Sequence, residues 1–87
     1  MSGYPGKLDP KLKAHLNKML ARFHVEIRRR EKTPLGRAAA LYACARLAHQ
    51  RASSDPERHF WKWYLANLEG HLEKLKAEAL KRKWGVA

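Results

Sequence analysis

Residues 33–50 read TPLGRAAALYACARLAHQ, and this stretch decides the fold. Thr33 followed by Pro34 is a typical helix start, because a threonine hydroxyl caps a free backbone N–H and proline suits the first helical position. Residues 38–48 contain six alanines and four larger apolar residues, which leave almost no polar face on this helix. A helix that is apolar nearly all round is buried on more than one side. We therefore predict the central helix of an all-α bundle over residues 34–51.

The same start signal occurs on either side of this stretch. Asp9-Pro10 and Asp55-Pro56 repeat it, and residues 54–57 also fit the S-x-x-E capping box. Helical periodicity continues between these points. The sequence predicts one all-α domain over residues 1–87, a three-helix bundle with an irregular N-terminal arm at residues 1–8. The predicted helices cover about 10–30, 34–51 and 56–83, with Gly85 as the stop.

The predicted third helix is longer than its neighbours. At about 28 residues it spans roughly 40 Å, against about 30 Å and 27 Å for the first and second helices. Its apolar residues follow the alternating four-three spacing of a coiled-coil seam. They are Trp61, Leu65, Leu68, Leu72, Leu75 and Ala79. We expect the last three to lack partners within the chain, so that a second copy or another protein covers them.

A second apolar line on the third helix contains two tryptophans that bracket small residues. Two interpretations are open. Trp63 and Trp84 border a groove for another helix, or Trp63 packs against the 34–51 helix and Trp84 is a loose end. The candidate partner or oligomer interface consists of Trp63, Gly70, Leu72, Leu75, Ala79 and Trp84.

Four basic residues of the first helix are spaced seven, four and seven residues apart. They are Lys11, Lys18, Arg22 and Arg29, which we call the basic column. A helix places them within about 40° of each other along roughly 27 Å. The opposite face is an apolar stripe that must be buried, formed by Leu12, Leu16, Met19, Leu20, Phe23 and Ile27. Among the acidic residues only Glu26 flanks the column, so the four charges lack compensation.

The formal charge of the 87 residues is +11, which implies an anionic partner such as nucleic acid or an acidic protein surface. The charge is concentrated toward the N-terminus. Residues 1–32 carry +6, residues 33–54 carry +3, and residues 55–87 carry only +2. We expect Arg28, Arg30, Arg37 and Arg51 to support the basic column. The alternative is that the column is only a solvated helix face.

Other classes of site receive no support from the sequence. Cys44 is the single cysteine, which excludes an intrachain disulfide and a cysteine-based zinc site. The five histidines show no metal-ligand spacing, and no catalytic triad or glycine-rich phosphate loop is present. We predict no enzyme activity, no cofactor and no metal. Without a signal peptide or an apolar run near 18 residues, we expect a cytoplasmic protein that does not enter a membrane.

The basic column predicts contact with a phosphate backbone rather than with base edges. The 50–55 junction lacks a glycine turn and is too long for a helix-turn-helix, and no RRM, KH or zinc-finger signature occurs. We expect a small nucleic-acid-binding protein or nucleic-acid-complex accessory protein, for DNA or RNA, with little sequence preference. The alternative is a regulator or adaptor that docks on an acidic protein through the long third helix.

Overall fold

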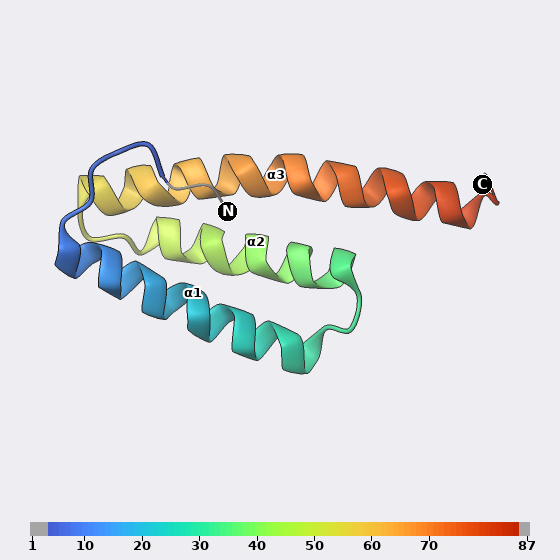
Figure 1. The fold of residues 1–87 in the computed structure, drawn as a ribbon, viewed down its shortest axis with the longest axis horizontal. Helices are drawn as coiled ribbons and strands as arrows, with labels where there is room; N and C mark the ends of the chain where they lie inside the picture. Colours follow the sequence, from blue (N-terminus) through green and yellow to red (C-terminus); the bar gives the residue numbers. More distant parts are fainter. Residues whose placement is uncertain (1–3, 86–87) are drawn as a thin grey trace.

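The chain forms three α-helices connected by short loops (Figure 1). The computed structural model describes residues 4–85. Helix α1 covers Pro10–Arg30, α2 covers Pro34–Gln50 and α3 covers Asp55–Lys83. The predicted three-helix bundle is confirmed, and each helix end lies within one residue of its predicted position. Gly85 follows the end of α3 with φ of 67°, the left-handed conformation that stops a helix.

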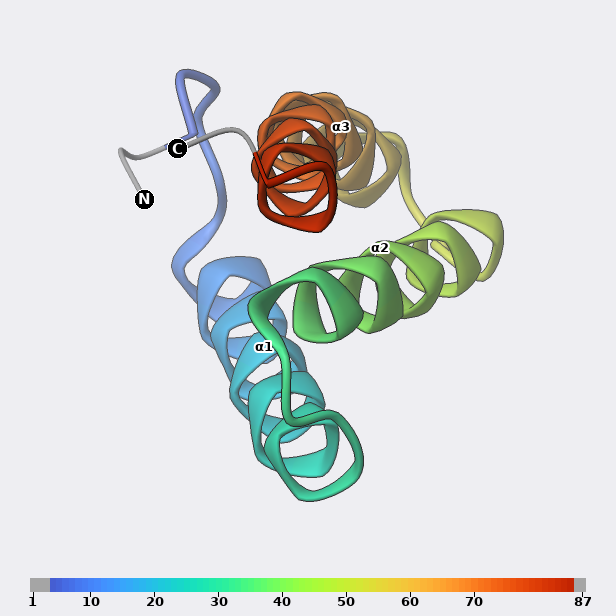
Figure 2. The same cartoon turned by 90° about the vertical axis from the view of Figure 1, so that its right-hand side faces the viewer.

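Helix α2 lies beside both other helices, and it packs more extensively along α3 than along α1 (Figures 1 and 2). Its buried positions are Ala38, Leu41, Ala45 and Ala48. Small alanine side chains let the neighbouring backbones approach closely, which explains the alanine-rich composition. The burial is one-sided, however, since Leu47 is 46% exposed and Ala39 and Ala43 also face solvent.

Aromatic rings of α3 form the centre of the core. Trp61 is fully buried, and Phe60 contacts it at 5.1 Å between ring centroids. Tyr64 stacks on Phe60 at 5.9 Å, and Phe23 of α1 lies 6.2 Å from Trp61. Burial raises the pKa of the Tyr64 phenol above its ordinary value of 10.0. Together with Leu16 and Ile27 of α1 and the buried leucine and alanines of α2, these rings form one core.

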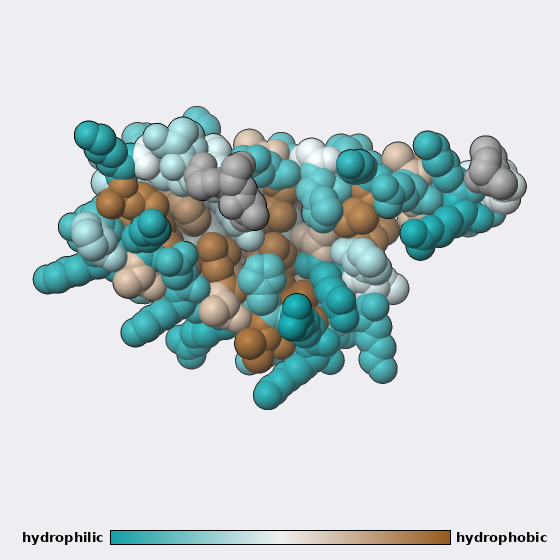
Figure 3. Space-filling view, viewed as in Figure 1, coloured by the Kyte–Doolittle hydropathy of each residue, from teal (hydrophilic) through white to brown (hydrophobic). Residues whose placement is uncertain are grey.

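The apolar stripe of α1 is covered less completely than we expected. Leu16 and Ile27 are buried, whereas its other four residues, Leu12, Met19, Leu20 and Phe23, are only half-buried. Helix α1 packs mainly against α2 and has little contact with α3, from which it diverges toward its C-terminal end (Figure 1). Figure 3 accordingly shows hydrophobic side chains in a band between α1 and α3.

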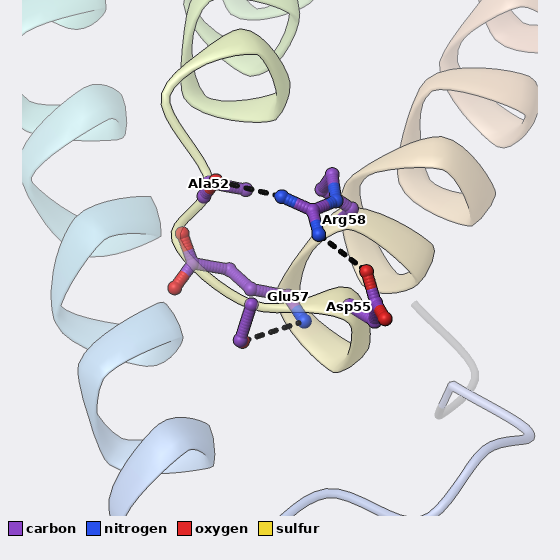
Figure 4. A network of polar contacts seen from close by, with 5 residues as sticks. Ala52, Asp55, Glu57 and Arg58 are labelled. Carbon is purple, nitrogen blue, oxygen red and sulfur yellow. Dashed lines mark hydrogen bonds and ion pairs between the residues drawn. The ribbon is translucent and has the colours of Figure 1, made fainter.

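The predicted helix caps are confirmed in part. Thr33 Oγ1 accepts from Gly36 N at 3.0 Å, and Ser54 Oγ accepts from Glu57 N at 3.4 Å. Asp9 makes no side-chain cap, so that prediction is wrong. Asp55 does not cap α3 either, because Ser54 holds that position and Asp55 pairs with Arg58 (Figure 4). This pairing lowers the Asp55 pKa.

The Arg58 guanidinium links the start of α3 to the preceding loop. One of its nitrogens bonds the Asp55 carboxylate, and Nη1 donates to the Ala52 carbonyl at 3.2 Å (Figure 4). Glu57 is buried, and its side chain points toward α1 instead of back to Ser54. The second bond of a capping box is therefore not formed here.

The N-terminal arm is irregular, as predicted, but it packs on the bundle. The ring of Tyr4 contacts Phe60 at 5.6 Å and Trp63 at 5.3 Å, both edge-on. Leu8 also packs against the core. Residues 1–3 of the predicted arm lie outside the described part of the chain. The arm thus covers a surface of α3 that the sequence left open for a partner.

Candidate nucleic-acid interface

All four residues of the basic column are exposed on the outer face of α1. Successive members are separated by about 10 Å, 6 Å and 10 Å along the helix axis. Figure 3 shows hydrophilic side chains projecting from the lower edge of the molecule, along α1. The helix is fixed on its inner side by buried Leu16 and Ile27. Its outer side therefore presents the four charges as a linear surface.

No ion pair or side-chain hydrogen bond engages the column anywhere in residues 4–85. The ion pairs in that range join Arg30 to Glu26, Arg58 to Asp55 and Lys76 to Glu73. Glu26 is thus directed to Arg30, at 3.9 Å, and does not neutralise Arg22 or Arg29. Lys18 and Arg22, which are four residues apart, repel each other by a few tenths of a kcal/mol. An external anion would relieve that repulsion.

The four supporting arginines differ in whether their side chains form hydrogen bonds or ion pairs within the chain. Arg28 and Arg51 are exposed and have no side-chain partner within the described residues. Arg30 is exposed, and its long, solvent-exposed pair with Glu26 holds it only weakly. Arg37 donates from Nε to the Glu31 carbonyl at 3.0 Å, so it also closes the α1–α2 loop. The structural role of Arg37 could not be predicted from its spacing.

An apolar side chain that the sequence analysis did not single out lies beside the column. Val25 is 53% exposed and borders a shallow hollow with Ala21, Arg22 and Phe23. Its helical position is three residues after Arg22 and four before Arg29, so it shares their face. This spacing could have revealed Val25 as an interruption of the charged surface.

Two residues of the predicted partner interface are corrected by the structure. Trp63 is half-buried and its ring contacts Tyr4 of the N-terminal arm, so it packs on the core instead of bordering an open groove. Leu72 is only 9% exposed within the chain. The hollow bordered by Leu35 and Ala79 shows why, because the start of α2 reaches this far along α3. Leu72 is therefore a core residue.

Ala79 and Trp84 lie at the C-terminal end of α3, which projects beyond α2 (Figure 1), whereas Gly70 borders a hollow with Tyr42 of α2. Leu75 is half-buried, and Gly70 and Ala79 are exposed. Trp84 is 74% exposed, and Leu80, four residues before it, is 54% exposed. The sequence analysis missed Leu80, although its i, i+4 spacing with Trp84 would have placed the two side by side.

Comparisons with known proteins give no relative from which a role could be transferred. No family model matches the chain, and neither the curated proteins nor the solved structures contain a significant match. Within residues 4–85, no three His, Cys, Asp or Glu side chains gather as a metal site would need. None of the three helices is long and apolar enough to cross a membrane. The candidate interface consequently depends on its own geometry and charge.

Proposed function

We propose that this protein binds the phosphate backbone of nucleic acid through the basic column of α1, with little preference for sequence. The observation that carries the proposal is the combination of exposure and missing partners at Lys11, Lys18, Arg22 and Arg29. Cations of this kind bind phosphates by releasing condensed counterions, which requires no contact with bases. The proposal covers a non-enzymatic, cytoplasmic role, alone or within a larger nucleic-acid complex.

The length of the column suits a polyanion better than a single anionic group. Along about 27 Å, duplex DNA presents on the order of sixteen phosphate charges on its two strands. Four cations in a line can therefore each find a phosphate without a fixed register. Arg28 and Arg51, which are also exposed, extend the positive surface. This geometry supports binding to many sequences with similar affinity.

The test compares two variants that lose the same charge. The column variant changes Lys11, Lys18, Arg22 and Arg29 to Gln, and the control variant changes Lys74, Lys81, Arg82 and Lys83 to Gln. We expect the column variant to lose most of its affinity for duplexes of unrelated sequence, measured by fluorescence anisotropy at moderate salt. The control variant should retain most of it. Equal affinity of the column variant and the parent would refute the proposal.

A second candidate function is docking on an acidic protein through the free end of α3. The exposure of Leu80 and Trp84 favours it, and three basic residues, Lys81, Arg82 and Lys83, surround them. An apolar patch bordered by positive charge suits a partner helix that carries acidic residues. Light scattering at micromolar concentration distinguishes such a partner from a second copy of the chain. A complex that survives nuclease treatment but is lost on Leu80→Asp would support this function.

A further inference from the structure

A groove between α2 and α3 gathers basic side chains that the basic column does not include. It encloses about 390 Å³, and no residue of α1 lines it. Helix α2 contributes Arg46, His49 and Gln50, and α3 contributes Lys62. None of these four side chains has a hydrogen-bond or ion-pair partner in the described part of the chain. The groove therefore holds several unused donors within one hollow.

The pairing of the two helices fixes which end of the groove is positive. Tyr42 donates from its hydroxyl to Glu69 Oε1 at 2.7 Å, which sets Tyr42 and Glu69 at one level of the antiparallel pair. His49 is seven residues after Tyr42, and Lys62 is seven before Glu69. Both are thus about 10 Å from that level and face each other across the groove. Arg46 lies between, about 6 Å from Tyr42 along the axis.

Glu69, the acidic residue that lines the groove, already accepts a hydrogen bond from within the chain. The Glu69 carboxylate accepts the Tyr42 hydroxyl, and this bond is the main cause of the raised Tyr42 pKa. Glu69 remains negatively charged at one end of the groove, but it forms no ion pair with Arg46 or Lys62, and Lys62 lies about 10 Å from it along α3. An anion bound at the Arg46–Lys62 end would gain charge-assisted hydrogen bonds from groups that now face only solvent.

We propose that the Arg46, His49 and Lys62 end of this groove is a binding site for a phosphate group. Arg46 and Lys62 supply two fixed positive charges, which match the charge of a phosphate monoester better than the single charge of a carboxylate. The planar guanidinium can bind two phosphate oxygens at once, and the Lys62 ammonium and Gln50 amide add further donors. Leu65 and Ala66 form an apolar wall for whatever group the phosphate carries.

This site is independent of the basic column, because it lies on different helices. The phosphate has two possible sources, a small phosphate ester such as a nucleotide or the backbone of a nucleic acid. If the source is a backbone, one chain would hold nucleic acid at two separate surfaces. In both cases the groove would bind phosphate oxygens, but a monoester brings up to two negative charges and a backbone diester only one, so the two positive charges favour the monoester.

The experiment is an NMR titration of the full chain with inorganic phosphate, a nucleoside monophosphate and a short oligonucleotide. We expect each probe that binds to cause saturable chemical-shift changes at the amides of Arg46, His49 and Lys62. The column variant should show the same ligand-induced changes at these amides as the parent. The double change Arg46→Gln and Lys62→Gln should weaken the binding by about tenfold or more, since the charge-assisted hydrogen bonds to phosphate oxygens are lost. A double change at Lys74 and Lys81 is the matched control.

The outcomes separate the two sources and can overturn the site. Shifts with all three probes identify a general phosphate site, whereas shifts with the oligonucleotide alone identify a backbone contact. Either result must disappear in the Arg46 and Lys62 double variant. Shifts that are absent with every probe, or that persist in this double variant, would overturn the proposal without affecting that of the basic column.

Discussion

The basic column makes a quantitative prediction about salt. If each of its four cations neutralises one phosphate, the slope of log affinity against log salt is about −3.6 for duplex DNA and about −2.8 for a single strand. Raising the salt fourfold, from about 50 to 200 mM, should then weaken duplex binding by about 150-fold, or about 3 kcal/mol. The assay is fluorescence anisotropy of a labelled duplex longer than the column.

Single changes allow the slope to be assigned to residues. Arg22→Gln and Lys18→Gln should each reduce the magnitude of the slope by about 0.9, whatever the sequence of the duplex. The full column variant loses all four contributions, so its slope should fall close to zero. Its free energy of unfolding should be unchanged or higher by a few tenths of a kcal/mol, because repulsion along α1 is removed.

Two results would refute this reasoning. In the first, the control variant of Lys74, Lys81, Arg82 and Lys83 loses as much slope as the column variant, so that only the total charge of the chain matters. In the second, the column variant keeps the slope of the parent at equal helicity. The column would then be only a solvated helix face, and protein docking through α3 would become the favoured function.

Three further predictions concern stability. Tyr4→Ala should cost about 2 kcal/mol and make Trp63 fluorescence easier to quench with iodide, because two edge-on ring contacts are lost. Leu72→Asp should cost at least about 3 kcal/mol in denaturant unfolding, whereas Leu80→Asp should cost less than about 0.5; equal costs would contradict the assignment of Leu72 to the core. Burial raises the Tyr64 pKa above 10.0, so its contribution to stability is present below that pH and is lost as the pH rises through the folded-state pKa. Tyr64→Phe should therefore reduce the loss of stability between neutral and strongly alkaline pH, and an unchanged profile would contradict it.

The helices could be predicted because their signals are local. A capping residue followed by proline acts within one turn, and helical periodicity needs no knowledge of the neighbouring elements. The exposure of the basic column follows from the same periodicity, since its members lie opposite Leu16 and Ile27. The sequence does not distinguish Ser54 from Asp55 as the cap of α3, because the side-chain oxygen of either residue can accept from a free N–H of the first turn.

The features that could not be predicted depend on how the helices meet. Half-burial of Phe23 follows from the divergence of α1 from α3, which no local pattern encodes. Cover of Trp63 by Tyr4 requires the arm to fold back over α3, across almost sixty residues of sequence. The groove proposed to bind phosphate likewise depends on the register of α2 and α3, which the bond between Tyr42 and Glu69 reveals.

The helices differ in how much they contribute to the core and to the charged surface. The α2–α3 pair contains most of the buried residues, including fully buried Trp61 and Ala45, and therefore supplies most of the stability. Helix α1 buries only Leu16 and Ile27, and the four charges of the basic column form no ion pair within residues 4–85. Replacing those charges should consequently leave the bundle intact. Affinity for an anion can thus be altered on α1 without altering the fold, which is why the charge variants described above separate function from stability.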